Sequence, residues 1–205
     1  LMRMTLIEPS GNKEIANLLP KDGWVQYYSQ IWDEDQCAAM FDALLQSLHW
    51  ETDQLVMFGE VITTKRKVVW VGDEGRSYTY SGIKKYPHPW ITELLAIKTR
   101  LEELAQWKFN SCLLNLYHNG SEGMGWHSDN EPELNPKAPI ASLSLGEIRK
   151  FAFRHKVDKT VSSLFLESGS VLMMHAPTQE AWQHSLLKTA KPVGPRINLT
   201  FRDIR

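Results

Sequence analysis

Cysteine is scarce in this sequence and long apolar runs are missing. Only Cys37 and Cys112 occur among the 205 residues, and each lies in a stretch whose pattern indicates burial. We therefore expect free thiols in a reducing compartment rather than a disulfide framework. No apolar run reaches the roughly 20 residues that span a bilayer, and the N-terminal stretch LMRMTLIEPS lacks the apolar core of a signal peptide. These absences predict an intracellular protein without a membrane span, cytoplasmic in a prokaryote and nuclear in a eukaryote.

A charge excess of one sign is also missing. The 23 basic and 24 acidic residues give a net charge of -1, which argues against a purely electrostatic nucleic-acid binder but permits a local basic face. A hydrophobic content of 42% allows a sizeable core. The length predicts one domain over residues 25–205, and a monomer is the default expectation. In residues 1–24, proline and glycine break any regular pattern, so this segment is expected to form a loose arm.

Two amphipathic helices are predicted in the N-terminal half. Asp33 is a good N-cap for a helix whose apolar residues repeat every three or four positions, namely Met40, Phe41, Leu44, Leu45 and Leu48. A second helix is expected after Pro87 and Pro89, with an apolar stripe of Ile91, Leu94, Leu95, Leu101 and Leu104.

Short strands dominate the rest of the sequence. From Ser111 onward the runs SCLLNLY, IASLSL, KFAFRH, SLFLES, SVLMMH, AWQHSLL and RINLTFR are separated by Gly, Pro, Asn and Asp. We expect an α+β, mainly β fold, in which two helices support a double-stranded β-helix (jelly-roll) core over residues 111–205. Residues 53–89 would form a hairpin-rich lid at the mouth of this core.

A histidine and an aspartate two positions apart follow the glycine-rich loop of NLYHNGSEGMGWHSD. On an extended strand, His127 and Asp129 would point to the same side. Alone, the pair is more often a polar surface turn than a metal site. A metal needs a further ligand, and His184 in the strand-like run AWQHSLL is a candidate. Two imidazoles and one carboxylate leave coordination positions open, as in non-haem Fe(II) oxygenases, although zinc hydrolases use similar ligands.

The final strand-like run, PRINLTFR, alternates strictly between polar and apolar residues. Its polar face carries Arg196, Asn198, Thr200 and Arg202. Two arginines lining a barrel would need anions, because buried unpaired charge is unfavourable, and their forked guanidiniums match carboxylates. A dicarboxylate would satisfy them, and Asn115 and Tyr117, which share a face of SCLLNLY, could donate hydrogen bonds to it. The alternative is a salt-bridged surface strand.

Taken together, these motifs resemble the AlkB family of Fe(II)- and 2-oxoglutarate-dependent dioxygenases. The resemblance extends from about residue 58 to residue 205, and it rests on NLYHNG, WHSD, PIASLSLG, RKFAFRHK, GSVLMMH, WQHSL and PRINLTFR in this order. It is closest to the branch that repairs alkylated bases in duplex DNA. The resemblance implies Fe(II) held by His127, Asp129 and His184, with O2 and 2-oxoglutarate as cosubstrates. The 2-oxoglutarate ligands that it implies are Asn115, Tyr117, Arg196, Asn198 and Arg202, with Arg196 on the distal carboxylate and Arg202 nearer the metal.

The resemblance also implies residues for the substrate. A base carrying a methyl group on its pairing edge must leave the duplex to be reached. Tyr80 would stack on the flipped base opposite His127, and Phe58 would fill the vacated stack. Further contacts to the base or DNA are implied for Arg66, Tyr78, Ser81 and Glu131, with Glu131 favouring a cationic methylated base.

The expected reaction is repair of 1-methyladenine or 3-methylcytosine in duplex or single-stranded DNA by direct reversal, releasing formaldehyde, succinate and CO2. The segment VDKTVSSLFLESG is shorter than its counterpart in the duplex branch, which leaves the strand preference open. The alternatives are the same chemistry on RNA or on a modified protein, and a metal-binding jelly-roll module without catalysis.

Overall fold

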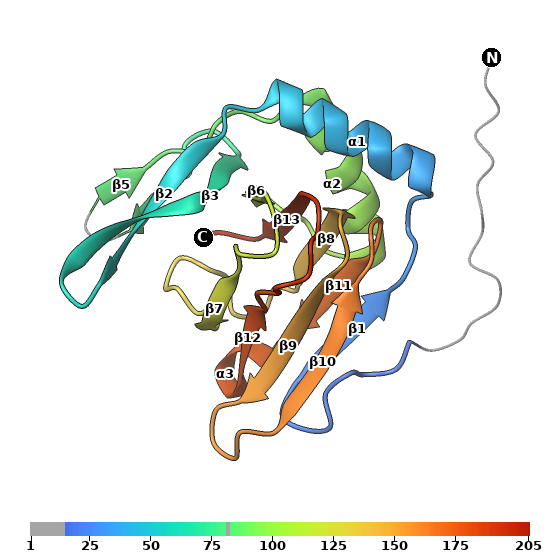
Figure 1. Cartoon of the computed structure of the whole chain (residues 1–205), viewed down its shortest axis with the longest axis vertical. Coiled ribbons are helices and arrows are strands. Elements are labelled where there is room, and N and C mark those ends of the chain that lie inside the picture. The colour runs from blue at the N-terminus through green and yellow to red at the C-terminus, as the bar shows by residue number, and fades with distance from the viewer. Residues whose placement is uncertain (1–14, 81–82) are drawn as a thin grey trace.

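The polypeptide forms two facing antiparallel sheets with helices on the outside (Figure 1). This computed structural model describes residues 15–80 and 83–205, with residues 55–57, 78–80 and 83 described by their backbone only. The elements are β1 (Trp24–Tyr28), α1 (Glu34–Ser47), β2 (Glu51–Met57), β3 (Glu60–Gly72), β4 (Tyr78–Tyr80), β5 (Ile83–Lys85), α2 (Thr92–Ala105), β6 (Ser111–Tyr117), β7 (Met124–His127), β8 (Ile140–Gly146), β9 (Arg149–His155), β10 (Val161–Leu166), β11 (Val171–His175), α3 (Thr178–Ala181), β12 (Trp182–Leu186) and β13 (Arg196–Arg202).

The sheet topology is that of a jelly roll, which confirms the predicted fold class. The large sheet has the order β1-β11-β8-β13-β6-β3-β2, and the small sheet has the order β10-β9-β12-β7. Strands β4 and β5 pair separately. The large sheet recruits β1, β2 and β3 from outside residues 111–205, because strand pairing depends on contacts that are remote in sequence.

Alternation along β6 and β13, interrupted at Leu113, gives the large sheet its two different faces. Leu114 and Leu116 of β6 pair with Leu199 and Ile197 of β13, and all four pack in the core that includes residues of α1 and α2. Asn115 and Tyr117 point to the opposite face, together with the polar residues of β13. The apolar residues therefore attach the sheet to the helices, and the polar residues face the interior between the sheets.

Both predicted helices are present. Asp33 caps α1 through a capping box, in which its side chain accepts from the Gln36 N–H and the Gln36 side chain accepts from the Asp33 N–H. Leu44 is fully buried, whereas Leu45 and Leu95, which were expected on the apolar stripes, are exposed. They lie at the edges of the stripes, beyond the strip of helix surface that the sheet covers. The short helix α3 was not predicted. Among the described residues, no helix is long and apolar enough to cross a membrane.

Residues 15–23 belong to the expected N-terminal arm, yet they pack onto the domain. Leu19 is buried in a cluster with Phe153 and Trp182, and the Trp182 indole donates to the Lys21 carbonyl at 3.0 Å. Leu19 thus holds this segment on the domain by packing against apolar side chains that lie between the two sheets. The rest of the expected arm, residues 1–14, lies outside the described residues.

The predicted lid begins with a long hairpin that continues the large sheet. The inner part of β3 pairs with β6, and the outer parts of β2 and β3 project beyond it as an arm (Figure 1). An irregularity in the register between Thr52 and Gln54 marks the base of this arm. At its tip, Phe58 and Gly59 both have positive φ, at 53° and 83°, as a two-residue hairpin turn requires.

Candidate active site

Three potential metal ligands converge between the two sheets. His127 is the last residue of β7, and His184 lies directly opposite it on β12. Asp129 follows two residues after β7, and the ligand atoms of the three side chains all lie within 4.8 Å of one another. The Asp129 Oδ1 atom is 3.7 Å from His127 Nε2 and 3.9 Å from His184 Nε2. The structure thus brings together the His-x-Asp pair and the third ligand that the sequence suggested.

The two imidazoles are prepared for metal binding in different ways. His127 Nδ1 lies 2.8 Å from the Gly125 carbonyl oxygen, which can only accept, so the proton is on Nδ1 and Nε2 keeps its lone pair. His184 is enclosed, with its ring stacked on Phe151 at 5.5 Å between centroids. Burial lowers the pKa of His184 to about 4, so this imidazole is neutral at physiological pH, as a metal ligand must be.

Asp129 is held as an ionised and oriented carboxylate. Burial raises its pKa, but the Arg202 guanidinium and the two imidazoles outweigh burial and leave the pKa well below its usual value. Arg202 Nη2 donates to Asp129 Oδ2 at 2.9 Å. The backbone N–H of Asp129 donates to Gln179 Oε1 at 2.8 Å, so the unpredicted helix α3 fixes the metal loop.

Arg196 is a buried cation on the inner face of the large sheet. It is 2% exposed, its Nη2 donates to Ser144 Oγ at 2.9 Å, and its guanidinium lies 5.7 Å from the centre of the Tyr117 ring. Its Nε is buried without a hydrogen-bond partner, and no ion pair joins it to a carboxylate of the described residues. Burial lowers its pKa to about 10, so it stays protonated at neutral pH. Such a group is a receptor for an anion.

A ladder of side-chain hydrogen bonds runs along the same face. Asn198 Nδ2 donates to Ser142 Oγ at 2.7 Å, and Thr200 Oγ1 donates to Asn198 Oδ1 at 2.9 Å. Ser142 and Ser144 of β8 were not identified from the sequence, although their alternation with the apolar residues of IASLSL is the signal that could have found them. Gln179 had no such signal.

Arg149 has a structural position rather than a surface one. Arg149, in the run RKFAFRHK, is only 1% exposed. Its guanidinium donates to the carbonyls of Asn119 at 3.2 Å, Glu122 at 2.7 Å and Leu187 at 2.8 Å. It therefore fastens the loop that precedes β7 to the chain just after β12. These two strands carry the candidate metal ligands His127 and His184.

Arg66 does not occupy the position expected of a DNA contact. Its side chain is buried, and it donates from Nη1 to Asn115 Oδ1 at 2.9 Å and from Nη2 to Asp53 Oδ2 at 3.0 Å. The strand register accounts for this correction: Lys67 pairs with Leu116, so the preceding residue lies at the level of Tyr117 and faces the interior.

The structure describes the other predicted substrate residues to different extents. Phe58 is fully exposed at the tip of the arm, at 101% of its reference area. Tyr78 and Tyr80 begin and end β4, but their side chains, like all of Ser81, lie outside the described residues. Glu131 follows the metal loop, and its Oε2 is buried without a hydrogen-bond partner.

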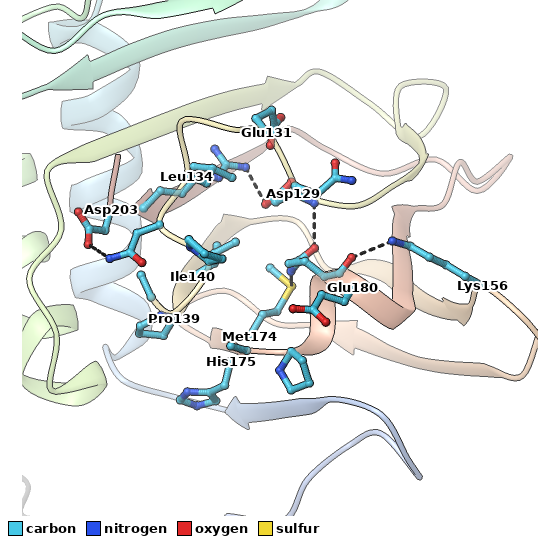
Figure 2. Close-up of a pocket in the computed structure, with 18 residues that line it drawn as sticks. Asp129, Glu131, Leu134, Pro139, Ile140, Lys156, Met174, His175, Glu180 and Asp203 are labelled. Carbon is cyan, nitrogen blue, oxygen red and sulfur yellow. Dashed lines mark hydrogen bonds and ion pairs between the residues drawn. The ribbon is translucent and has the colours of Figure 1, made fainter. Parts of the chain in front are cut away.

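A cavity of about 310 Å³ opens beside the candidate metal centre. Figure 2 shows Asp129 and Glu131 on the loop at one side of it, with Pro139, Ile140 and Met174 across from them. The cavity therefore combines an apolar wall with carboxylates. Two imidazoles on facing strands and one ionised carboxylate on the loop after β7 fit Fe(II) with open coordination positions, and the buried cation Arg196 fits an anionic cosubstrate.

Comparison with known proteins assigns this architecture to a family. The sequence profile described as "2OG-Fe(II) oxygenase superfamily" matches residues 24–202. DNA oxidative demethylase ALKBH2 of Mus musculus is 37% identical over 188 residues, covering 86% of this chain and 79% of the relative. Alpha-ketoglutarate-dependent dioxygenase alkB homolog 3 of Bos taurus is 35% identical over 182 residues, covering 84% of this chain and 63% of the relative.

The chain belongs to the AlkB family within the 2OG-Fe(II) oxygenase superfamily. It is a dioxygenase, with Fe(II) as its metal and 2-oxoglutarate and O2 as its cosubstrates. The fold agrees, since the solved structure of OsALKBH1 superposes with a TM-score of 0.60 at 18% identity, covering 87% of this chain and 97% of that one.

Proposed function

We propose that this protein repairs DNA by oxidatively demethylating N-alkylated bases such as 1-methyladenine and 3-methylcytosine. The observation that carries the proposal is the 37% identity to a DNA oxidative demethylase over 86% of the chain. The match to the 2OG-Fe(II) oxygenase profile, over residues 24–202, spans the His127–Asp129–His184 cluster and the buried Arg196. Since the ALKBH2 relatives are named as DNA demethylases, we take DNA as the substrate and treat RNA as an outcome of the test.

The reaction suits a group that hydrolysis cannot remove, because a methyl group on a ring nitrogen has no leaving group. When bound, Fe(II) and 2-oxoglutarate supply an oxidation in which O2 gives one atom to succinate, formed with CO2, and one to the methyl carbon. The resulting hydroxymethyl group loses formaldehyde, and the ring nitrogen keeps the electron pair of the broken bond. The protein residues supply binding and orientation.

His127, Asp129 and His184 would hold the iron. Arg196, buried and without a carboxylate partner, would bind the distal carboxylate of 2-oxoglutarate, with Asn115, Tyr117 and Asn198 beside it on the same face. Arg202, 2.9 Å from Asp129, would lie near the end of the cosubstrate that approaches the metal. The row of charges thus fixes which end of the dicarboxylate meets the metal.

Two further features support a nucleic-acid base as substrate. Phe58 is an aromatic side chain exposed in full on a strained backbone, and strain of this kind clusters at functional sites. It would fill the gap that a flipped base leaves. The buried Glu131 Oε2 gives the site an acceptor that a cationic methylated base would satisfy better than its neutral product. Tyr78 and Tyr80 remain the proposed stacking residues, with Ser81 beside them.

The test is mass spectrometry of an oligonucleotide that carries a single 3-methylcytosine. It is incubated single-stranded and paired with the protein, Fe(II), 2-oxoglutarate and O2, alongside an Asp129→Ala variant. We expect the oligonucleotide to become lighter by about 14 Da, the mass of CH2, with the wild type, and to keep its mass with the variant. The two rates give the strand preference.

Other outcomes would change the proposal. Succinate formation without loss of the methyl group from either DNA strand would keep the dioxygenase and reject DNA as its substrate, and a matched RNA oligonucleotide would follow. Equal demethylation by the Asp129→Ala variant would show that the candidate metal centre does not carry the activity.

A further inference from the structure

A buried ion pair connects the base of the β2–β3 arm to the cosubstrate face. Arg66 on β3 and Asp53 on β2 lie 3.0 Å apart, with side chains only 7% and 16% exposed. Buried pairs contribute little to stability, because desolvation offsets their attraction. Their position is therefore more informative than their strength.

The backbone is irregular at this pair. On β2, Thr52 pairs with Lys67 and Gln54 pairs with Thr63, so three residues of β3 oppose Asp53 alone. The Thr64 hydroxyl closes the bulge through contacts of 3.2 Å with the Asp53 carbonyl and 3.0 Å with the Arg66 carbonyl. Bulges redirect side chains next to functional sites, and this one directs Arg66 and Asp53 toward each other beside β6.

The second contact of Arg66 determines the orientation of Asn115. A guanidinium can only donate, so the Asn115 atom 2.9 Å from Arg66 Nη1 is the carboxamide oxygen. With Oδ1 bound in this way, the polar atom left on the other side of the carboxamide is Nδ2, a donor. Asn115 pairs with Asn198 across β6 and β13, on the face that carries Arg196.

The charge of Arg66 also acts on Tyr117, which lies on the same face as Asn115. Burial raises the pKa of the Tyr117 phenol, and the charges of Arg196, Arg66 and Arg149 oppose that rise. Three buried guanidiniums thus lie around one phenol. Arg196 has no carboxylate partner among the described residues and suits an anion. Arg149 is bound to carbonyls, and Arg66 is neutralised by Asp53, which suits a role in orientation.

We propose that Arg66 is a positioning residue of the cosubstrate site, which holds the Asn115 carboxamide with Nδ2 toward 2-oxoglutarate and links it through Asp53 to the base of the arm. This rests on the proposed 2-oxoglutarate contact of Asn115. Loss of Arg66 would let the carboxamide turn and present its oxygen to a carboxylate, which replaces an attraction with a repulsion.

The test is isothermal titration calorimetry of 2-oxoglutarate into the Fe(II)-loaded full chain without oxygen. We compare Arg66→Met with the double variant Arg66→Met/Asp53→Asn, which removes both charges and avoids leaving one buried alone. Lys65→Met is the matched control, because it removes a cation from the adjacent, exposed position. Iron affinity and melting temperature are measured on each protein.

We expect both Arg66 variants to bind 2-oxoglutarate about tenfold more weakly or worse, since a hydrogen bond to a charged partner is lost. Iron affinity and the Lys65→Met control should match the wild type. Affinities for 2-oxoglutarate within twofold of the wild type in both variants would overturn the proposal. A selective loss of oligonucleotide binding would also overturn it and would indicate that Arg66 contacts DNA.

The double variant separates orientation from folding. Recovery of 2-oxoglutarate affinity in the double variant would show that the isolated Asp53 charge caused the loss, and would overturn the proposal. A wild type that binds no 2-oxoglutarate would overturn both this inference and the proposed function. Normal cosubstrate binding without demethylation would reject the proposed function alone.

Discussion

Replacing Arg196 by methionine should stabilise the protein while abolishing its response to 2-oxoglutarate. Burial lowers the pKa of Arg196 from 12.5 to about 10, which corresponds to roughly 3 kcal/mol, because one pKa unit equals about 1.4 kcal/mol. The guanidinium is charged in both the folded and the unfolded chain at neutral pH. The penalty is therefore present in full below pH 10 and is relieved only as the pH rises above it.

Two interactions of Arg196 offset part of that penalty. The hydrogen bond to Ser144 Oγ, at 2.9 Å, contributes about 1 kcal/mol, and the contact with the Tyr117 ring contributes about another. Arg196→Met should thus raise the free energy of unfolding by about 1 kcal/mol. For a domain of this size, that raises the melting temperature by about 2–4 °C.

The cosubstrate response should change in the opposite direction. In the wild type, 2-oxoglutarate at a hundred times its Kd adds about 2.7 kcal/mol, so the melting temperature of the Fe(II)-loaded protein should rise by about 5–10 °C. Differential scanning calorimetry without oxygen should find no such rise for Arg196→Met, because the carboxylate loses its buried partner.

Arg149→Met is the matched control for this prediction. It makes the same replacement at a buried arginine, but it leaves three carbonyls without their donor, so we expect about 3 kcal/mol of destabilisation or more. A loss of stability in Arg196→Met as large as in Arg149→Met, together with a retained shift with 2-oxoglutarate, would refute the reasoning.

Four further predictions concern the metal centre, the arm tip, the substrate pocket and the buried thiols. Asp129→Ala should reduce the bound iron from about one per chain to nearly none by elemental analysis, and normal iron content would remove Asp129 from the ligands. Phe58→Asn should relieve the left-handed backbone at the tip and stabilise by about 1 kcal/mol, while slowing repair of paired but not single-stranded substrate; equal slowing on both would exclude a stack-filling role. Glu131→Gln should lower the preference for cationic methylated bases over neutral adducts, measured as competition between two labelled oligonucleotides. An unchanged preference would exclude this role for Glu131. Cys37 and Cys112 are buried, and burial raises the pKa of both thiols, so thiol reagents at pH 8 should label the protein only on unfolding; rapid labelling of the native protein would contradict this.

Local pattern was sufficient for much of the fold. The three- and four-residue spacing after Asp33 predicted α1 with its capping residue, because helix period and capping depend on neighbours within one turn. The alternation in RINLTFR predicted which residues of β13 share a face, because the pleat of a strand is a property of the strand itself.

Local pattern failed where the partner is remote. Arg66, Arg149 and Arg196 are the same residue type in strand-like runs, and their local sequence does not separate a DNA contact from a structural clamp or an anion receptor. Their roles depend on which strand lies alongside: the pairing of β3 with β6 brings Arg66 to Asn115, 49 positions away. The alternation in IASLSL puts Ser144 on a polar face but does not name its partner Arg196, and Gln179 became recognisable only beside Asp129.

The sequence by itself determined the chemistry that this protein can carry, since ligand types, strand alternation and helix caps are set by the residues and their near neighbours. The tertiary structure decided which of those groups act together. Whether an arginine binds an anion, fastens a loop or orients an amide depends on burial and on the register between strands far apart in the chain, and both are fixed only when the two sheets close on each other.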